Sequence, residues 1–144
     1  MSKKVLIATV VVFVFFSLYS WLINGVILAS AYQSTASLWR PDMARLMWVY
    51  QVINLVGAFF FVFVFSKGYE GRGMMEGVRY GIYMGIWIGI GYAYGTYSMV
   101  AIPYWMAATW FWTTILQYVI AGIITVAMFG KVPMVTTIAP SGKP

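Results

Sequence analysis

Side chains capable of acid–base or ligand chemistry are few in this chain of 144 residues. The sequence contains no cysteine and no histidine, and its side-chain carboxylates are Asp42, Glu70 and Glu76. Thiolate nucleophiles, zinc sites and histidine-ligated haem or copper therefore lack their usual ligands. General acid–base catalysis has few candidates left. We therefore expect a protein that is not an enzyme, with no catalytic or metal-binding residues and no cofactor of its own.

The other distinctive polar side chains are four amides that interrupt long apolar segments: Asn24, Gln51, Asn54 and Gln117. Ser17 and Ser20 precede Asn24 at helical spacing, and Gln51 lies one turn from Asn54. Such side chains commonly form hydrogen bonds between membrane helices, and this is the role that we favour for them. The alternative is that the amides line a polar path, with a small pocket shared by Asn24, Gln51 and Asn54.

The elements that must position these side chains are predicted from the charge distribution. Only 8% of the residues are charged, compared with about 25% in soluble proteins. A membrane-spanning helix needs about 20 apolar residues, and the uncharged intervals provide room for four such helices. The sequence therefore predicts an all-α polytopic membrane protein, a four-transmembrane-helix bundle within residues 1–130. The expected spans are about 5–30, 43–66, 76–99 and 103–129.

The basic residues predict the orientation of this bundle. Seven of the nine Lys and Arg residues belong to the two termini and to the loop between the second and third spans. Because cytoplasmic loops are enriched in Lys and Arg, both termini are predicted to be cytoplasmic. The net charge of +6 then suits anionic lipid, and no nucleic-acid partner is expected. Residues 131–144 contain three prolines and are predicted to form an extended cytoplasmic tail.

A stripe of small residues marks the third predicted span. Glycine recurs every fourth residue at Gly77, Gly81, Gly85 and Gly89, and Gly91 and Gly95 repeat this spacing once more. Small residues at this spacing allow helix backbones to approach closely in lipid. The stripe is therefore expected to be a helix-packing face, directed either at another helix of this chain or at a partner.

The loop before this span carries most of the charge in the chain. Its charged residues are Lys67, Glu70, Arg72, Glu76 and Arg79. If the helix begins early, the spacing predicts that Glu76 pairs with both Arg72 and Arg79.

The same loop carries a resemblance to a known family. The segment from Lys67 to Gly73, the segment from Glu76 to Gly81, Ile102-Pro103 and Trp110 resemble a family of small uncharacterised bacterial four-helix integral membrane proteins. The likeness covers most of the chain up to about Lys131. It implies a bacterial inner (cytoplasmic) membrane and a four-helix architecture, and it provides no catalytic residue.

The predicted spans contain no charged side chain near their middle, which argues against ion-coupled transport. Small glycine faces, many aromatic residues and ten methionines suit a protein that docks onto others. The favoured interpretation is a non-catalytic accessory or structural subunit of a larger bacterial membrane protein complex. It would contact larger integral membrane subunits and lipids through helix packing, an aromatic surface and the tail. The alternative is a small oligomeric transporter or channel for a neutral solute.

Overall fold

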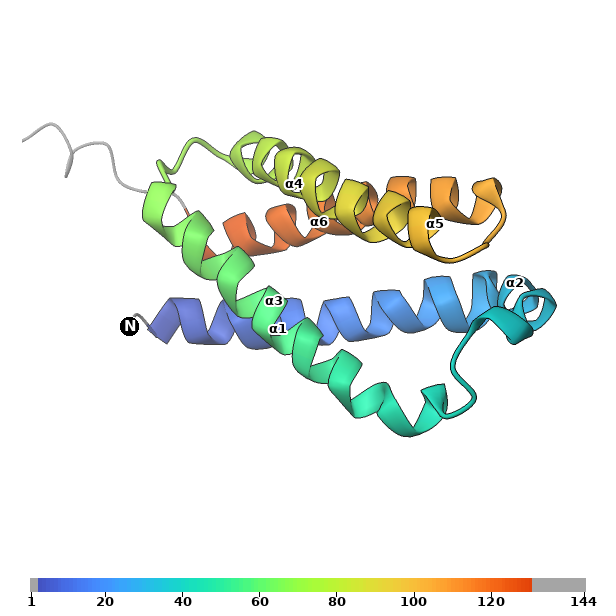
Figure 1. Ribbon diagram of the computed structural model, residues 1–144. Helices are drawn as coiled ribbons and strands as arrows, with labels where there is room; N and C mark the ends of the chain where they lie inside the picture. The colour runs from blue at the N-terminus through green and yellow to red at the C-terminus, as the bar shows by residue number, and fades with distance from the viewer. Residues whose placement is uncertain (1–2, 131–144) are drawn as a thin grey trace, which may run out of the picture.

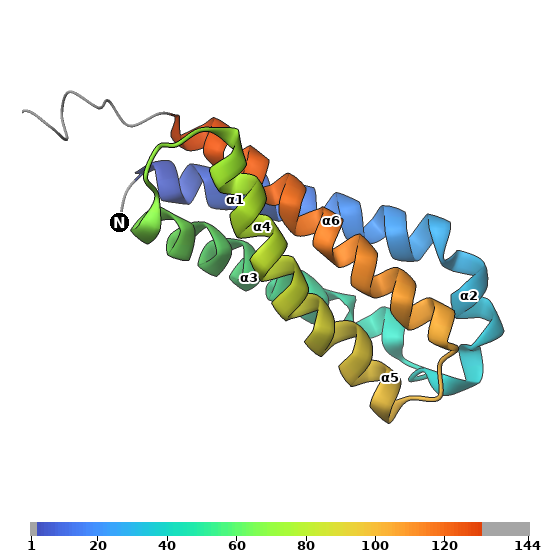
Figure 2. The same cartoon turned by 90° about the horizontal axis from the view of Figure 1, so that it is seen from above.

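A computed structural model of the chain describes residues 3–130, so the expected tail at 131–144 lies outside the described residues. The described part is all-helical, without a strand, as the sequence predicts. Figures 1 and 2 show long helices running back and forth along one axis, with both described ends of the chain at the same end of the bundle. We call this the near end, and we call the opposite one the far end.

The first predicted span differs from a single regular helix. Its elements are α1 (Lys3–Ser20), a π-helical segment (Trp21–Ile27), α2 (Ala29–Ser34) and a 3-10 turn (Ala36–Leu38). Helical structure therefore continues to Ser34, past the expected end near Ser30. The wider π-helical turns coincide with Asn24, whose side chain bonds back to its own helix and forward to others, as described below.

The second long helical segment of the bundle begins with a 3-10 turn, Met43–Leu46, that leads into α3 (Met47–Gly68). The third consists of α4 (Met74–Gly89), a second π-helical segment (Ile90–Tyr94) and α5 (Gly95–Met99). The fourth is α6 (Tyr104–Phe129), which begins directly after the extended Pro103. Proline at this position suits a helix start because its missing N–H would have no helical partner.

The helices pack in two antiparallel pairs. α1 packs against α3, α4 packs along α6, and α1 joins the pairs by its contact with α6. At the near end the core contains Phe16, Phe61 and Tyr118, whose rings contact one another. At the far end it contains Met106 and Trp110. The short turn between Met99 and Tyr104 reverses the chain, so that α4 runs antiparallel along α6.

Three helices are long and apolar enough to cross a membrane: Lys3–Ile27, Met43–Gly68 and Tyr104–Phe129. The region from Met74 to Met99 is not among them. Its glycines and tyrosines make it less apolar than its neighbours, although it lies alongside α6 in the bundle. The structure thus supports a membrane protein with three clear candidate spans.

Candidate functional site

The closest contact between helices is built from the glycines of α4. A Cβ atom on Gly77 would fall on the carbonyl oxygen of Gly122, and one on Gly122 would fall on the carbonyl oxygen of Gly77. A Cβ on Gly81 would meet the carbonyl oxygen of Tyr118 and would lie 2.5 Å from the Cα of Val119. Since these neighbours are backbone atoms, they cannot move aside without separating the helices.

The rest of the glycine stripe divides into two parts. A Cβ on Gly85 would lie 2.7 Å from the Cα of Ile115, and one on Gly89 would lie 3.2 Å from the Cδ1 of Phe111. A Cβ on Gly91 or Gly95 would have no such neighbour within 4 Å among the described residues. The first four glycines therefore face α6 within the chain, whereas a packing role for Gly91 and Gly95 stays a prediction.

Asn24 is the centre of a polar and aromatic cluster at the far end of the bundle. Its Oδ1 accepts hydrogen bonds from Trp110 Nε1 at 3.1 Å and from Tyr32 Oη at 2.9 Å, and its Nδ2 donates to the Ser20 carbonyl at 3.2 Å. The Tyr92 ring, from the second π-helical segment, lies 5.0 Å from the Trp110 ring. Asn24 thus joins the first span to α6, as expected for a hydrogen bond between helices.

The three tryptophans in the first turns of α6, Trp105, Trp110 and Trp112, differ in exposure. The structure leaves Trp112 66% exposed, but Trp110 is only 2% exposed. The reason is its hydrogen bond to Asn24, which gives the indole N–H a partner inside the bundle.

The other amides do not join Asn24 in a shared hydrogen-bond network. Gln51 is exposed, and its Oε1 accepts a hydrogen bond from Ser17 Oγ at 2.8 Å, which links α3 to α1. Asn54 is 8% exposed, and its Nδ2 has no hydrogen-bond partner among the described residues. Gln117 is half-buried on α6. A pocket common to Asn24, Gln51 and Asn54 therefore has no support from these contacts.

The charged loop is held by Glu76, but not in the way the spacing predicts. Glu76 Oε2 and Oε1 accept hydrogen bonds from the backbone N–H groups of Glu70 at 2.6 Å and Arg72 at 2.9 Å. The Arg72 side chain pairs instead with Glu70, Nε to Oε1 at 2.7 Å. The predicted Arg72–Glu76 side-chain pair is wrong because α4 begins at Met74, so Arg72 precedes the helix.

The two remaining loop cations lie apart from this arrangement. Arg79 is exposed, and the predicted pair with Glu76 is wrong because Glu76 turns back toward the loop backbone. The ammonium group of Lys67 lies 4.9 Å from the centre of the Phe63 ring. The loop also needs two glycines, since Gly71 and Gly73 have φ angles of 72° and 103°.

Replacing Glu76 with alanine should loosen this loop. Removing the carboxylate leaves two backbone N–H groups without their acceptor, at a cost of about 1 to 2 kcal/mol. Amide hydrogen exchange at Glu70 and Arg72 should accelerate accordingly. The control is Glu70→Ala, which removes the exposed pair with Arg72 but keeps both backbone donors on Glu76. Equal exchange rates in the two variants would contradict the role of Glu76.

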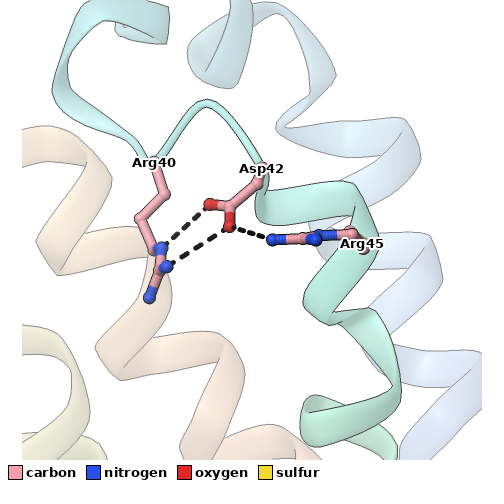
Figure 3. Close-up of polar contacts among 3 residues, drawn as sticks. All are labelled: Arg40, Asp42 and Arg45. Atoms are coloured by element: carbon pink, nitrogen blue, oxygen red, sulfur yellow. Dashed lines mark hydrogen bonds and ion pairs between the residues drawn. The ribbon is translucent and has the colours of Figure 1, made fainter.

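The loop at the far end contains a second charged cluster, shown in Figure 3. Asp42 Oδ1 accepts a hydrogen bond from Arg40 Nε at 3.0 Å, and Asp42 Oδ2 accepts one from Arg45 Nη2 at 3.0 Å. The bonds from Arg40, and then those from Arg45, lower the pKa of the Asp42 carboxyl below its ordinary value. Both arginines are largely exposed, so the cluster fixes a turn at the surface.

This lowered pKa predicts a pH dependence. Because the folded pKa lies below the unfolded value of about 3.9, the stabilisation is present above that value and is lost as the pH falls through the folded pKa. A carbon-13 NMR titration should find the Asp42 pKa below 3.9 and should find it raised in Arg40→Gln. Arg79→Gln is the control and should leave it unchanged. The same Asp42 pKa with and without Arg40 would rule out the assigned cause.

All three side-chain carboxylates of the chain are thus engaged by arginines or by backbone N–H groups. No group of three or more potential metal-ligating side chains occurs within residues 3–130.

Some hydrogen bonds between distant residues could not be predicted from the sequence. Nothing in it indicates that Lys4 Nζ donates to the carbonyl of Phe129 at 3.0 Å, or that Tyr32 binds Asn24. The spacing of Asn24 on a helix indicated a bond but not its partner.

An exposed aromatic pair lies on α4, on a side away from its glycine contact. Tyr83 is 68% exposed and Trp87 is 72% exposed, and they are one helical turn apart. Within residues 3–130 neither the Tyr83 hydroxyl nor the Trp87 indole N–H forms a hydrogen bond. The other exposed side chains of α4 include Arg79, which lies one turn before Tyr83, and Ile82 and Ile86.

The described part of the chain is all-helical, with three candidate membrane-spanning helices. Its core is held by backbone contact between α4 and α6 and by the cluster around Asn24. Comparison of the chain with protein-family models, curated proteins and solved structures finds no match. The resemblance noted in the loop sequence therefore stays a prediction.

Proposed function

We propose that this chain is a non-catalytic accessory or structural subunit of a larger complex in a bacterial cytoplasmic membrane. The first four glycines of the stripe pack against α6, and Asn24 and the carboxylates form hydrogen bonds within the chain. No cluster of catalytic groups therefore remains among the described residues. What the chain presents outward is large apolar and aromatic side chains. This distribution suits a protein whose role is to contact lipid and other membrane helices.

The observation that carries the proposal is the aromatic pair Tyr83 and Trp87. Trp87 lies near the middle of the segment from Met74 to Met99, which runs alongside α6. If this segment crosses the membrane beside α6, the exposed indole N–H lies in the hydrocarbon core, although tryptophan and tyrosine favour the interface. A hydrogen-bond acceptor on a neighbouring subunit would satisfy it. The aromatic pair is therefore the proposed contact with larger integral membrane subunits.

Co-purification tests this contact. Extraction of the full chain in mild detergent should bring out larger membrane subunits in fixed stoichiometry, measured by mass spectrometry. The double substitution Tyr83→Leu with Trp87→Leu should reduce their recovery at least tenfold. The matched control is Trp105→Leu with Trp112→Leu, which alters two exposed aromatic residues on α6. A monodisperse small oligomer without other subunits, or equal recovery from both variants, would contradict the proposal.

The proposed topology has four spans, with Met74–Met99 as the fourth and both termini cytoplasmic. Its support is the packing of this segment along α6 and the basic residues of the loop near Arg72. Because the chain has no cysteine, single-cysteine variants carry no background label. In intact cells a membrane-impermeant maleimide should label Ser37→Cys, whereas Arg72→Cys should react only after permeabilisation. Labelling of both positions in intact cells would contradict four spans.

A second candidate is a small oligomeric transporter or channel for a neutral solute. The observation in its favour is the buried Asn54 amide, whose Nδ2 has no hydrogen-bond partner within residues 3–130. It is less well supported because Asn24 and Gln51 are already bonded to neighbouring helices. Glycerol flux into proteoliposomes should then depend on Asn54, and an unchanged flux in Asn54→Leu would eliminate this candidate.

A further inference from the structure

Arg79 is a charged side chain on the outer surface of α4. It is exposed, and within residues 3–130 its guanidinium forms no ion pair and no hydrogen bond. The other three arginines each pair with a carboxylate of the chain: Arg40 and Arg45 with Asp42, and Arg72 with Glu70. Arg79 is therefore the arginine whose donors are left for a group outside the described residues.

The glycine contacts fix the level of Arg79 along α6. Gly77 packs on Gly122, and Gly81, four residues later, packs on Tyr118. Arg79 lies midway between the two α4 glycines, so it is level with the middle of the α6 stretch from Tyr118 to Gly122. At 1.5 Å per residue, this level is about 13 Å inside the near end of α6.

This level places the charge of Arg79 close to the surface of the hydrocarbon core. α6 has 26 residues and is about 39 Å long, whereas the core of a membrane is about 30 Å thick. With α6 centred across the core and α4 alongside it, the Arg79 backbone lies about 9 Å inside the core. Long side chains on a helix lean toward its N-terminus, which for α4 is the near end. The guanidinium is thus directed at the boundary between hydrocarbon and headgroups, where it needs an anionic partner.

The near end of the bundle carries an excess of positive charge. Its carboxylates are those of Glu70 and Glu76, and its described cations are Lys3, Lys4, Lys67, Arg72 and Arg79. Glu70 pairs with Arg72, and Glu76 accepts hydrogen bonds from two backbone N–H groups of the loop. The near end is therefore complementary in charge to the anionic phospholipids of a membrane surface.

The outer face of α4 continues from Arg79 into the membrane as an apolar track. Ile82 and Ile86 follow Arg79 at i+3 and i+7, so they lie on the same side of the helix, and both are exposed. The aromatic pair Tyr83 and Trp87 lies on the other flank of this track. An acyl chain can lie along the two isoleucines while its headgroup meets the guanidinium.

We propose that Arg79 binds the phosphate of an anionic phospholipid in the leaflet at the near end, with an acyl chain along Ile82 and Ile86. A guanidinium presents two parallel N–H donors to two phosphate oxygens, a geometry that the ammonium of lysine lacks. The site lies beside the aromatic pair on α4, and it does not depend on a partner subunit.

Phosphorus–carbon dipolar NMR measures this contact directly. The full chain, with carbon-13 in its arginine guanidinium groups, is reconstituted in bilayers of phosphatidylcholine with or without phosphatidylglycerol. The Arg79 signal, identified by its loss in Arg79→Lys, should be dephased by phosphorus, and more strongly when phosphatidylglycerol is present. No phosphorus contact in either bilayer, as expected if the true partner is a carboxylate of another subunit, would overturn the proposal. Equal contact in the two bilayers would overturn the preference for an anionic lipid.

Lipid retention provides the second measurement. Native mass spectrometry of the chain released from nanodiscs with equal amounts of the two lipids should find phosphatidylglycerol retained in preference. Arg79→Gln should reduce this preference at least fivefold, and Arg79→Lys should reduce it less because the charge is kept. The matched control is Lys67→Gln, which removes another exposed cation of the near end and should have a clearly smaller effect. Equal losses from Arg79→Gln and Lys67→Gln would show that net charge attracts the lipid, and would overturn the assignment to Arg79.

Discussion

Gly81→Ala should destabilise the bundle by about 1 to 3 kcal/mol, although alanine is the better helix former. The added Cβ would meet the carbonyl oxygen of Tyr118 and would lie 2.5 Å from the Cα of Val119. Both are backbone atoms of α6, so no side-chain rotation can make room, and α4 must move outward. This movement opens the contact between Gly77 and Gly122 as well. The free energy of unfolding, measured by SDS titration with circular dichroism, should report the loss.

The matched control for this substitution is Gly91→Ala. Gly91 belongs to the same stripe, but a Cβ there meets nothing within 4 Å among the described residues. Its substitution should therefore be neutral or stabilising by up to about 1 kcal/mol, the usual gain from glycine to alanine in a helix. The difference between the two variants separates backbone contact from helix propensity. Equal stabilities would show that α4 and α6 do not pack as closely as the structure indicates.

The glycine stripe also shows what the sequence can and cannot determine. Its four-residue spacing predicts one close-packed face, and the structure places that face of α4 on α6. The spacing does not specify the partner. Gly122 is the only glycine within α6, and elsewhere α6 meets the α4 glycines with backbone atoms and with the side chains of Val126 and Phe111. The spacing also does not show that Gly91 and Gly95 are left open, since this depends on the π-helical segment Ile90–Tyr94 that changes the helical phase.

Helix positions were predictable for a simpler reason. Long uncharged intervals predict α1, α3 and α6 close to where they lie, since any such segment in lipid must satisfy its backbone groups as a helix. The loop contacts were less predictable. The spacing of Arg72 and Glu76 indicates an ion pair only if one helix includes both residues. Gly73 has a φ angle of 103°, which is not helical, so α4 begins after it and Arg72 lies outside the helix. Backbone donors then compete successfully for the Glu76 carboxylate.

The polar residues show the same limit over longer distances. Asn24 and Trp110 are 86 positions apart, and no local pattern connects them. Their contact depends on the crossing of α1 and α6, which is set by the packing of Phe16 and Tyr118 nearer the other end. Ser17 and Gln51 likewise meet only because α3 crosses α1 at that level. An amide in an apolar segment therefore predicts a hydrogen bond, while the global packing chooses its partner.

Asn24→Leu should be the most damaging change among the amides, with a loss of about 1 to 3 kcal/mol in the free energy of unfolding. The substitution leaves both the Trp110 indole N–H and the Tyr32 hydroxyl without their acceptor inside the bundle. Loss of the bond should also alter the environment of the buried indole, so tryptophan emission should change in the native state. SDS titration followed by fluorescence measures both effects.

Two comparisons identify the cause of this loss. Gln51→Leu removes a single bond from an exposed position and should cost only about 0.6 kcal/mol, the average for side-chain hydrogen bonds between membrane helices. Trp110→Phe removes one donor but leaves Asn24 bonded to Tyr32, so Asn24→Leu should cost less in that background than in the unaltered chain. Strict additivity of the two changes would mean that the Asn24–Trp110 bond contributes nothing. A coupling of about 1 kcal/mol would show that one asparagine helps to hold the first span and α6 together at the far end of the bundle.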